Sequence, residues 1–111
     1  MRRTRFRLGR TELVDVMKRG KRAQSTLFSC VYLPAPVGSS RAGVVVSKKV
    51  AATAVMRNRM RRQTYEVLRA LLPEVSPAIL LVCVAKKEAK GMTHAALKQT
   101  LEELFLKKKV Y

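Results

Sequence analysis

The segment that decides the fold, residues 43–72, reads GVVVSKKVAATAVMRNRMRRQTYEVLRALL. Its first five residues, Gly43 to Ser47, include three consecutive valines, which predicts a strand. Apolar side chains then recur at helical spacing from Met56 to Leu71, which predicts a helix over residues 53–72 that Pro73 ends. A strand followed by a long amphipathic helix indicates an α+β domain in which helices pack on a sheet.

The chain begins with a basic segment and a short helix. Residues 1–9 are rich in arginine, and we expect this arm to be mobile when no partner is bound. A helix is predicted over residues 11–19, with Thr11 as its cap and Gly20 as a left-handed stop.

One strand, and a possible second short one, are predicted before the deciding segment. The side chains of residues 26–33 would alternate between the two faces of a sheet, which predicts a strand. Residues 21–25 can add a short strand before it. The turn-rich residues 34–40 predict a hairpin between the 26–33 strand and the strand over residues 43–47.

The end of the chain predicts one more strand and helix. Residues 78–85 are continuously apolar, so this strand should be central and covered. Residues 93–108 predict an amphipathic helix whose core stripe consists of Leu97, Leu101, Leu104 and Phe105. The order α-β-β-α-β-α, with one optional extra strand, predicts a two-layer α-β sandwich.

Composition indicates one folded domain, residues 1–111, with a polyanionic partner. Apolar residues make up 48% of the chain, which is enough for one core. Lys and Arg number 24 against 7 acidic residues, which gives a formal net charge of +17. A folded protein keeps such self-repulsion when a polyanion offsets it, so nucleic acid is the expected partner.

An anionic membrane surface is the competing polyanion. The sequence has no run of about 18 apolar residues, no signal-peptide core and no lipidation motif. We therefore expect a cytoplasmic protein without a membrane partner. A transit peptide would also be rich in arginine, but Glu12 and Asp15 follow at once, whereas transit peptides are poor in acids.

Residues for metal binding or catalysis form no recognisable motif. Cys30 and Cys83 lie apart in apolar runs, which predicts buried free thiols. The single histidine, His94, has no motif partner, and the adjacent Glu102 and Glu103 diverge by about 100° on a helix. We expect no catalytic side chain and no metal ligand in this chain.

One side of the helix over residues 53–72 is basic. Seven basic residues lie between Lys48 and Arg69, with Glu66 as the only acid. A guanidinium group can bind two phosphate oxygens or stack on a base, which favours RNA. A solvated basic face is the alternative, although like charges four residues apart destabilise a free helix by a few tenths of a kcal/mol each.

This segment resembles a known family. A strand ending in Ser47-Lys48-Lys49-Val50, followed by Ala54-Val55-Met56-Arg57-Asn58-Arg59 and Arg61-Arg62, is similar to the signature of bacterial ribonuclease P protein subunits. The order of elements agrees over nearly the whole chain. Two features depart from the family pattern: Ala51 and Ala52 stand where many members have glycine, and Leu13 and Met17 stand where the first helix usually offers aromatics.

The resemblance implies a fold, a function and a set of contact residues. The fold would be ribosomal-protein-like, with a left-handed βαβ crossover. The chain would bind the catalytic RNA and the 5′ leader of precursor tRNA, without a further protein partner, while that RNA and its magnesium carry out cleavage. The candidate RNA-binding residues are Lys48, Lys49, Arg57, Asn58, Arg59, Arg61, Arg62 and Arg69. The candidate leader cleft, between the first helix and the sheet, consists of Leu13, Met17, Phe28 and Tyr32.

Three other functions remain open. A ribosomal or other structural RNA-binding protein would share the charge and size, and the RNA that copurifies would distinguish it. A ribonuclease acting alone would cleave RNA without added RNA. A membrane-active cationic protein would bind vesicles in competition with RNA.

Overall fold

The computed structural model describes residues 6–36 and 38–107. The predicted order of helices and strands is confirmed, and the optional short strand is present as β1. The elements are α1 (Arg10–Arg19), β1 (Lys21–Gln24), β2 (Phe28–Pro34), β3 (Arg41–Val45), α2 (Ala54–Leu71), η1 (Leu72–Glu74), β4 (Ile79–Ala85), η2 (Lys87–Ala89), α3 (His94–Glu102) and the π-helical turn η3 (Glu103–Lys107).

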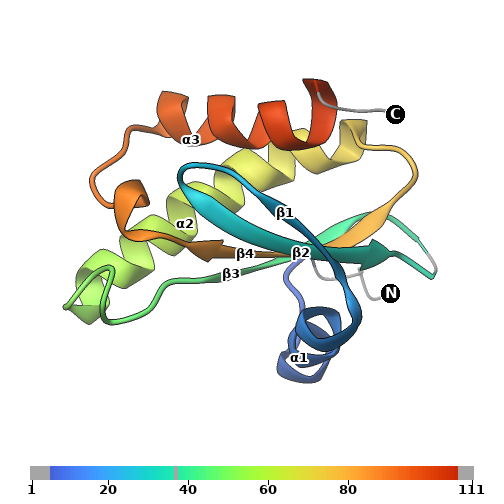
Figure 1. The fold of residues 1–111 in the computed structure, drawn as a ribbon, viewed down its shortest axis with the longest axis horizontal. Helices are drawn as coiled ribbons and strands as arrows, with labels where there is room; N and C mark the ends of the chain where they lie inside the picture. Colours follow the sequence, from blue (N-terminus) through green and yellow to red (C-terminus); the bar gives the residue numbers. More distant parts are fainter. Residues whose placement is uncertain (1–5, 37, 108–111) are drawn as a thin grey trace, which may run out of the picture.

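The four strands form one mixed sheet in the order β1-β2-β4-β3 (Figure 1). β4 pairs antiparallel with β2 and parallel with β3, so the predicted central position of this apolar strand is confirmed. The predicted hairpin between β2 and β3 is wrong, because β4 lies between them and the hairpin joins β1 to β2 instead. A strand that is apolar on both faces is stabilised most at the centre, where neighbours cover it on both sides.

Helices cover the two faces of the sheet unequally. Helices α2 and α3 lie on one face, which confirms the predicted α-β sandwich, and α1 packs on β2 and β4 from the other face (Figure 1). Along β2, Phe28 and Cys30 belong to the core beneath α2 and α3, whereas Val31 belongs to the smaller cluster beneath α1. The alternation of a strand therefore divides the core into two parts.

The ends of α1 differ from the prediction. The N-cap is Gly9 rather than Thr11, and the backbone N–H of Gly9 donates to Glu12 Oε1 at 2.9 Å. Gly20 has a φ of −77°, so its role is not a left-handed stop. A Cβ added there would lie 2.5 Å from Val31 Cγ1 and 2.7 Å from a backbone carbonyl oxygen of α1. Glycine is required because the end of α1 approaches β2 so closely.

The segment before α1 is held against the sheet. The Leu8 N–H donates to the Ala42 carbonyl at 2.8 Å, and the Ala42 N–H donates to the Phe6 carbonyl at 3.0 Å. Phe6 packs on the α2 side and Leu8 is buried on the α1 side. Phe6 and Leu8 of the predicted mobile arm therefore lie hydrogen-bonded along the sheet edge, whereas the mobility of the arm without a partner stays a prediction. Residues 1–5 lie outside the described residues.

The last helix is shorter than predicted. Helix α3 ends at Glu102 and continues as the turn η3, while residue 108 lies outside the described residues. Leu97 and Leu101 are buried as predicted, and Leu104 and Phe105 pack partly buried against the same core.

The two cysteines lie opposite each other on β2 and β4. Cys30 and Cys83 are free and buried, as predicted, with their Sγ atoms 3.4 Å apart. The hydrogen bond between Cys83 and Cys30 and the burial of the site raise the pKa of the Cys83 thiol.

Candidate nucleic-acid interface

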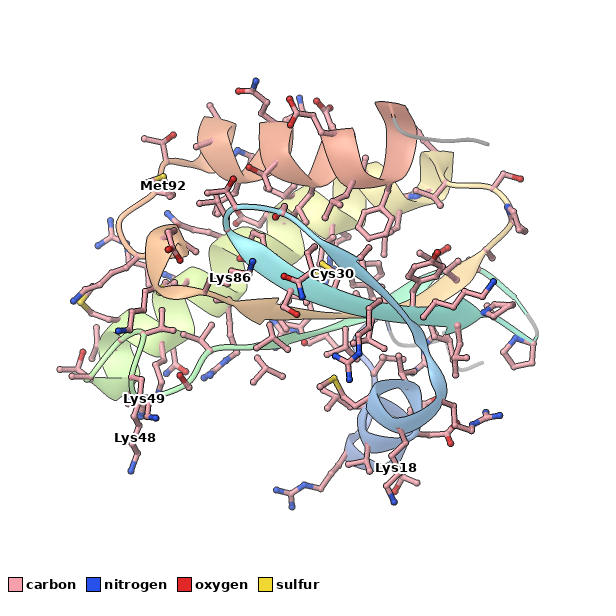
Figure 2. The ribbon with its side chains drawn as sticks, in the orientation of Figure 1. Lys18, Cys30, Lys48, Lys49, Lys86 and Met92 are labelled. Carbon is pink, nitrogen blue, oxygen red and sulfur yellow. The ribbon has the colours of Figure 1, made fainter. Side chains whose placement is uncertain are left out.

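Lys48 and Lys49 lie on a tight turn between β3 and α2. The Ser47 carbonyl accepts hydrogen bonds from the backbone N–H groups of Val50 and Ala51, each at 3.1 Å. Ala51 is completely buried, whereas both lysines extend into solvent (Figure 2). The turn is thus anchored to the core while it presents two cations.

Arg57 fastens this turn to α2. Its Nη1 donates to the carbonyl oxygens of Ala51 at 3.0 Å and Ala52 at 3.1 Å. Thr53 caps the helix, because its Oγ1 accepts from the Met56 N–H at 3.2 Å. The sequence grouped Arg57 with the RNA-binding residues, whereas the structure also gives it a part in holding the backbone.

The arginines and the asparagine of α2 form one surface of the helix. We call this surface the arginine face; it consists of Asn58, Arg59, Arg62 and Arg69, which are exposed, with Arg57 and Arg61 half-buried along its border. Arg61 Nη2 donates to Asn58 Oδ1. On the opposite side, Met60 and Leu71 are buried, but Met56 is 38% exposed although the sequence placed it in the core stripe.

The charge of the arginine face is not neutralised by ion pairs between described residues. The two such pairs join Arg19 to Asp15 and Arg41 to Glu12, and neither uses a candidate RNA-binding cation. Helix α2 has no acidic residue in its first turn, so the positive end of its dipole adds to this potential. The surface therefore favours an anionic partner.

Aromatic rings support the far end of this surface. The Arg69 guanidinium lies 5.1 Å from the centre of the Phe6 ring, and that of Arg7 lies 4.2 Å from the centre of the Tyr65 ring. The two rings meet edge to face, with centres 6.4 Å apart. Sequence reasoning missed Arg7 as a fixed cation, because only Phe6 and Leu8 around it follow the alternation of a strand.

An ion pair links three parts of the chain near α1. Arg41 Nη1 donates to Glu12 Oε2 at 2.6 Å, and Arg41 Nη2 donates to the Arg7 carbonyl at 3.1 Å. The Arg41 hydrogen bond, followed by that from the Gly9 N–H, lowers the pKa of Glu12. β3, α1 and the segment before α1 are thereby held together.

The four predicted leader-cleft residues lie on two different faces of the sheet. Leu13 and Met17 pack in the cluster beneath α1. Phe28 is 1% exposed in the core beneath α2 and α3, and Tyr32 packs on that same side, with its ring edge-on to Phe105 at 6.3 Å. The predicted cleft is therefore wrong as a single surface, because the sheet itself separates the two pairs.

The α1 side of the sheet carries a different set of partly accessible residues. Ser29, Val84 and Val45 lie side by side on β2, β4 and β3, and all three are half-buried. We call these three residues the sheet row. A Cβ added to Gly43 would lie 2.8 Å from Leu13 Cδ1, so glycine allows α1 to rest directly on β3. The sequence could not reveal this row, because it depends on the insertion of β4 beside β3.

The described residues form neither a metal-binding cluster nor a helix able to span a membrane. No group of three or more His, Cys, Asp or Glu residues in this part of the chain is placed to hold a metal ion. No helix within it combines the length and the apolar character that crossing a membrane requires.

Comparisons with known proteins agree on one family. The sequence profile of the family described as Ribonuclease P matches residues 1–109. The ribonuclease P protein component of Exiguobacterium sp. is 34% identical over 100 residues, which cover 90% of this chain and 86% of that protein. The ribonuclease P protein component of Picosynechococcus sp. is 27% identical over 96 residues, which cover 86% and 83%.

Solved structures share the fold. The RNase P protein from Thermotoga maritima has a TM-score of 0.81 at 22% identity, and the match covers 96% of this chain and 100% of that protein. The RNase P protein of Staphylococcus aureus has a TM-score of 0.78 at 23% identity, covering 91% and 93%. The chain therefore belongs to the ribonuclease P protein family, whose role lies in the processing of tRNA 5′ ends within an endoribonuclease complex that contains RNA.

Proposed function

We propose that this chain binds the catalytic RNA of ribonuclease P through the turn carrying Lys48 and Lys49 together with the arginine face of α2. The observation that carries the proposal is a set of exposed cations on one rigid helix and its preceding turn, without ion-pair partners among the described residues. Arginine suits this task because its planar fork binds two phosphate oxygens at once.

The rigidity of α2 supports this assignment. Met60, Thr64, Val67, Leu68 and Leu71 are buried in the core, so the helix cannot rotate its basic side away from a partner. Structured RNA is recognised mainly through the shape of its backbone and its 2′-hydroxyl groups. A fixed line of donors matches such a target with little loss of conformational entropy.

We further propose that the 5′ leader of precursor tRNA lies on the α1 side of the sheet, over the sheet row and beside Met17. The half-buried apolar side chains of Val45 and Val84 offer contact to unstacked bases. At the β1 edge of this face, Lys86 Nζ donates to Gln24 Oε1 at 3.0 Å, which holds a cation near the path of the leader. Softer apolar contacts replace aromatic stacking here.

The proposal assigns cleavage to the RNA and its magnesium. Phosphodiester hydrolysis needs metal ions or an acid and a base held at the scissile bond. This chain would supply binding energy, neutralise phosphates and position the leader.

Cleavage of a precursor tRNA at low magnesium tests the function directly. A bacterial ribonuclease P RNA should remove the leader efficiently when this chain is added and poorly when it is not. Arg59→Ala should weaken association with that RNA, whereas Lys98→Ala, which removes an exposed cation on α3, should not. A chain that fails to stimulate leader removal would contradict the proposal.

The salt dependence of binding tests its electrostatic basis. With about five phosphate contacts, a fourfold rise in salt should weaken binding about 500-fold, taking the behaviour of duplex DNA as a first approximation. An affinity that hardly changes with salt would refute a phosphate-based interface.

The leader assignment needs its own test. Met17→Glu should narrow the difference in affinity between precursor and mature tRNA, because the new carboxylate repels the leader. Val14→Glu places the same charge elsewhere on α1, where the side chain is 44% exposed, and should leave that difference unchanged. Equal losses for both tRNAs with Met17→Glu would reject the leader surface.

A further inference from the structure

A pocket of about 230 Å³ opens beside the arginine face, between α2, the segment after β4 and the beginning of α3. Its floor consists of Phe28, Met60 and Leu97, all less than 9% exposed. Met56 from α2 and Met92 from the loop before α3 form its walls, and Figure 2 shows Met92 on that loop. The pocket lies on the α2 and α3 side of the sheet, away from the surface proposed for the leader.

The walls are apolar at the surface of a highly charged protein. Met56 and Met92 are each 38% exposed and both line the pocket. Exposed apolar groups that gather at one place mark an interaction site. Methionine is flexible and polarisable, and its sulfur makes favourable contacts with aromatic rings. Such walls suit a flat aromatic ligand.

The rim of the pocket is polar and basic. Arg59 lines the opening together with the Gln63 side chain, which carries both a donor and an acceptor. Lys87 and Lys90 are exposed on the segment that forms the other side, with Glu88 as the acid between them. A ligand that places a ring inside and a negative charge outside would match both parts.

The size of the pocket limits the ligand to one small ring system. Pockets that bury a drug-sized molecule measure about 300–1,000 Å³, so this one is smaller. A single nucleobase fits this description, because its ring would enter the pocket while the attached phosphate stays at the rim.

We propose that this pocket receives one unstacked nucleobase of the catalytic RNA, with the neighbouring phosphate against Arg59. The inference rests on the proposed function and adds a contact to it that is not electrostatic. The catalytic RNA is the source, because Arg59 belongs both to the arginine face and to the pocket.

Affinity measurements at two salt concentrations test the pocket. The double substitution Met56→Ala with Met92→Ala should weaken binding to the catalytic RNA by about 5- to 10-fold, at the lower end of what base stacking contributes. The factor should be the same at both salt concentrations, because no charge is lost. Arg59→Ala should instead reduce the salt slope by about one.

Val14→Ala is the matched control, since it shortens another exposed apolar side chain, on α1, and should leave the affinity unchanged. If the double variant binds RNA as tightly as the parent chain, the pocket proposal is overturned and a protein side chain becomes the better occupant. If the parent chain itself does not bind the RNA, the proposed function fails instead, so the two failures are distinguishable.

Crosslinking identifies the contact. A photoreactive diazirine analogue of methionine placed at position 92 of the assembled complex should label one unpaired nucleotide of the catalytic RNA. Labelling of the precursor tRNA, or labelling spread along paired RNA, would overturn the proposal.

Discussion

Arg57 and Arg59 stand two residues apart on α2, and their contacts predict different consequences of substitution. Arg57→Ala removes two hydrogen bonds, to the carbonyl oxygens of Ala51 at 3.0 Å and Ala52 at 3.1 Å. A hydrogen bond to a charged group contributes about 1.5–3 kcal/mol, and the exposure of Ala52 to solvent reduces that contribution. We expect the free energy of unfolding to fall by about 1–2 kcal/mol.

Thermal unfolding followed by circular dichroism measures this difference. For a domain of this size the loss corresponds to a Tm about 5–10 °C lower for Arg57→Ala. Arg59→Ala is the matched variant, and it should keep the parent Tm while weakening RNA binding. Arg57→Lys keeps the charge, but its ammonium group cannot take the position of Nη1 equally well, so its Tm should lie between those of Arg57→Ala and Arg59→Ala. If all three variants unfold at the same temperature, the tether assigned to Arg57 does not exist.

Three further predictions concern stability and reactivity. Gly20→Ala should destabilise the fold by about 1–3 kcal/mol in urea unfolding, because the added methyl group has no room although the φ of −77° suits alanine; an increase in stability would contradict this. The Arg41 hydrogen bond lowers the pKa of Glu12 from its ordinary value of 4.5, so the resulting stability is complete above pH 4.5 and is lost as the pH falls through the lowered pKa. Glu12→Gln should therefore weaken the dependence of Tm on pH in that acid range, and an unchanged dependence would reject the ion pair as its cause. Cys30 and Cys83 should resist alkylation in the native chain at pH 8 and react in urea, since both are buried and the pKa of Cys83 is raised; rapid labelling of the native chain would show that β2 and β4 separate.

The sequence predicted the elements better than their arrangement. Continuous apolar character identified β4 as the central strand, because such a strand needs neighbours on both sides. The hairpin between β2 and β3 was wrong because adjacency in the chain favours pairing, whereas α2 carries the chain across the sheet and inserts β4 between them. Local patterns carry no information about that insertion.

The same limit explains the divided leader cleft. Alternation correctly placed Phe28 and Tyr32 on one face of β2, but it did not tell which helix covers that face. The packing of α1 is fixed by the close approach at Gly20 and Gly43, and these contacts bring Leu13 and Met17 to the opposite face. A glycine in a sequence can indicate that another element packs closely there, but it does not identify that element.

The arginine face shows where pattern and geometry diverge within one helix. Helical spacing correctly placed Asn58, Arg59 and Arg62 at the surface. The tether made by Arg57 depends on the path of the preceding turn, which no periodicity encodes. The fixed position of Arg7 likewise depends on pairing with β3, since a segment of four residues is too short for a recognisable strand pattern.

In the proposed function, the sheet separates two kinds of recognition. Mature tRNA lacks the leader, so discrimination between precursor and product must arise on the α1 side, from apolar contacts that respond weakly to salt. Association with the catalytic RNA arises on the α2 side, from guanidinium groups whose effect salt screens strongly. The sheet row lies on one side of the sheet, and α2, which carries the arginine face, lies on the other side. A substitution on one surface can therefore change its affinity for RNA without displacing the residues of the other surface. The rigid sheet would then hold the leader at a constant distance from the RNA that cleaves it. The protein would thus contribute to cleavage by positioning the substrate relative to the catalytic RNA.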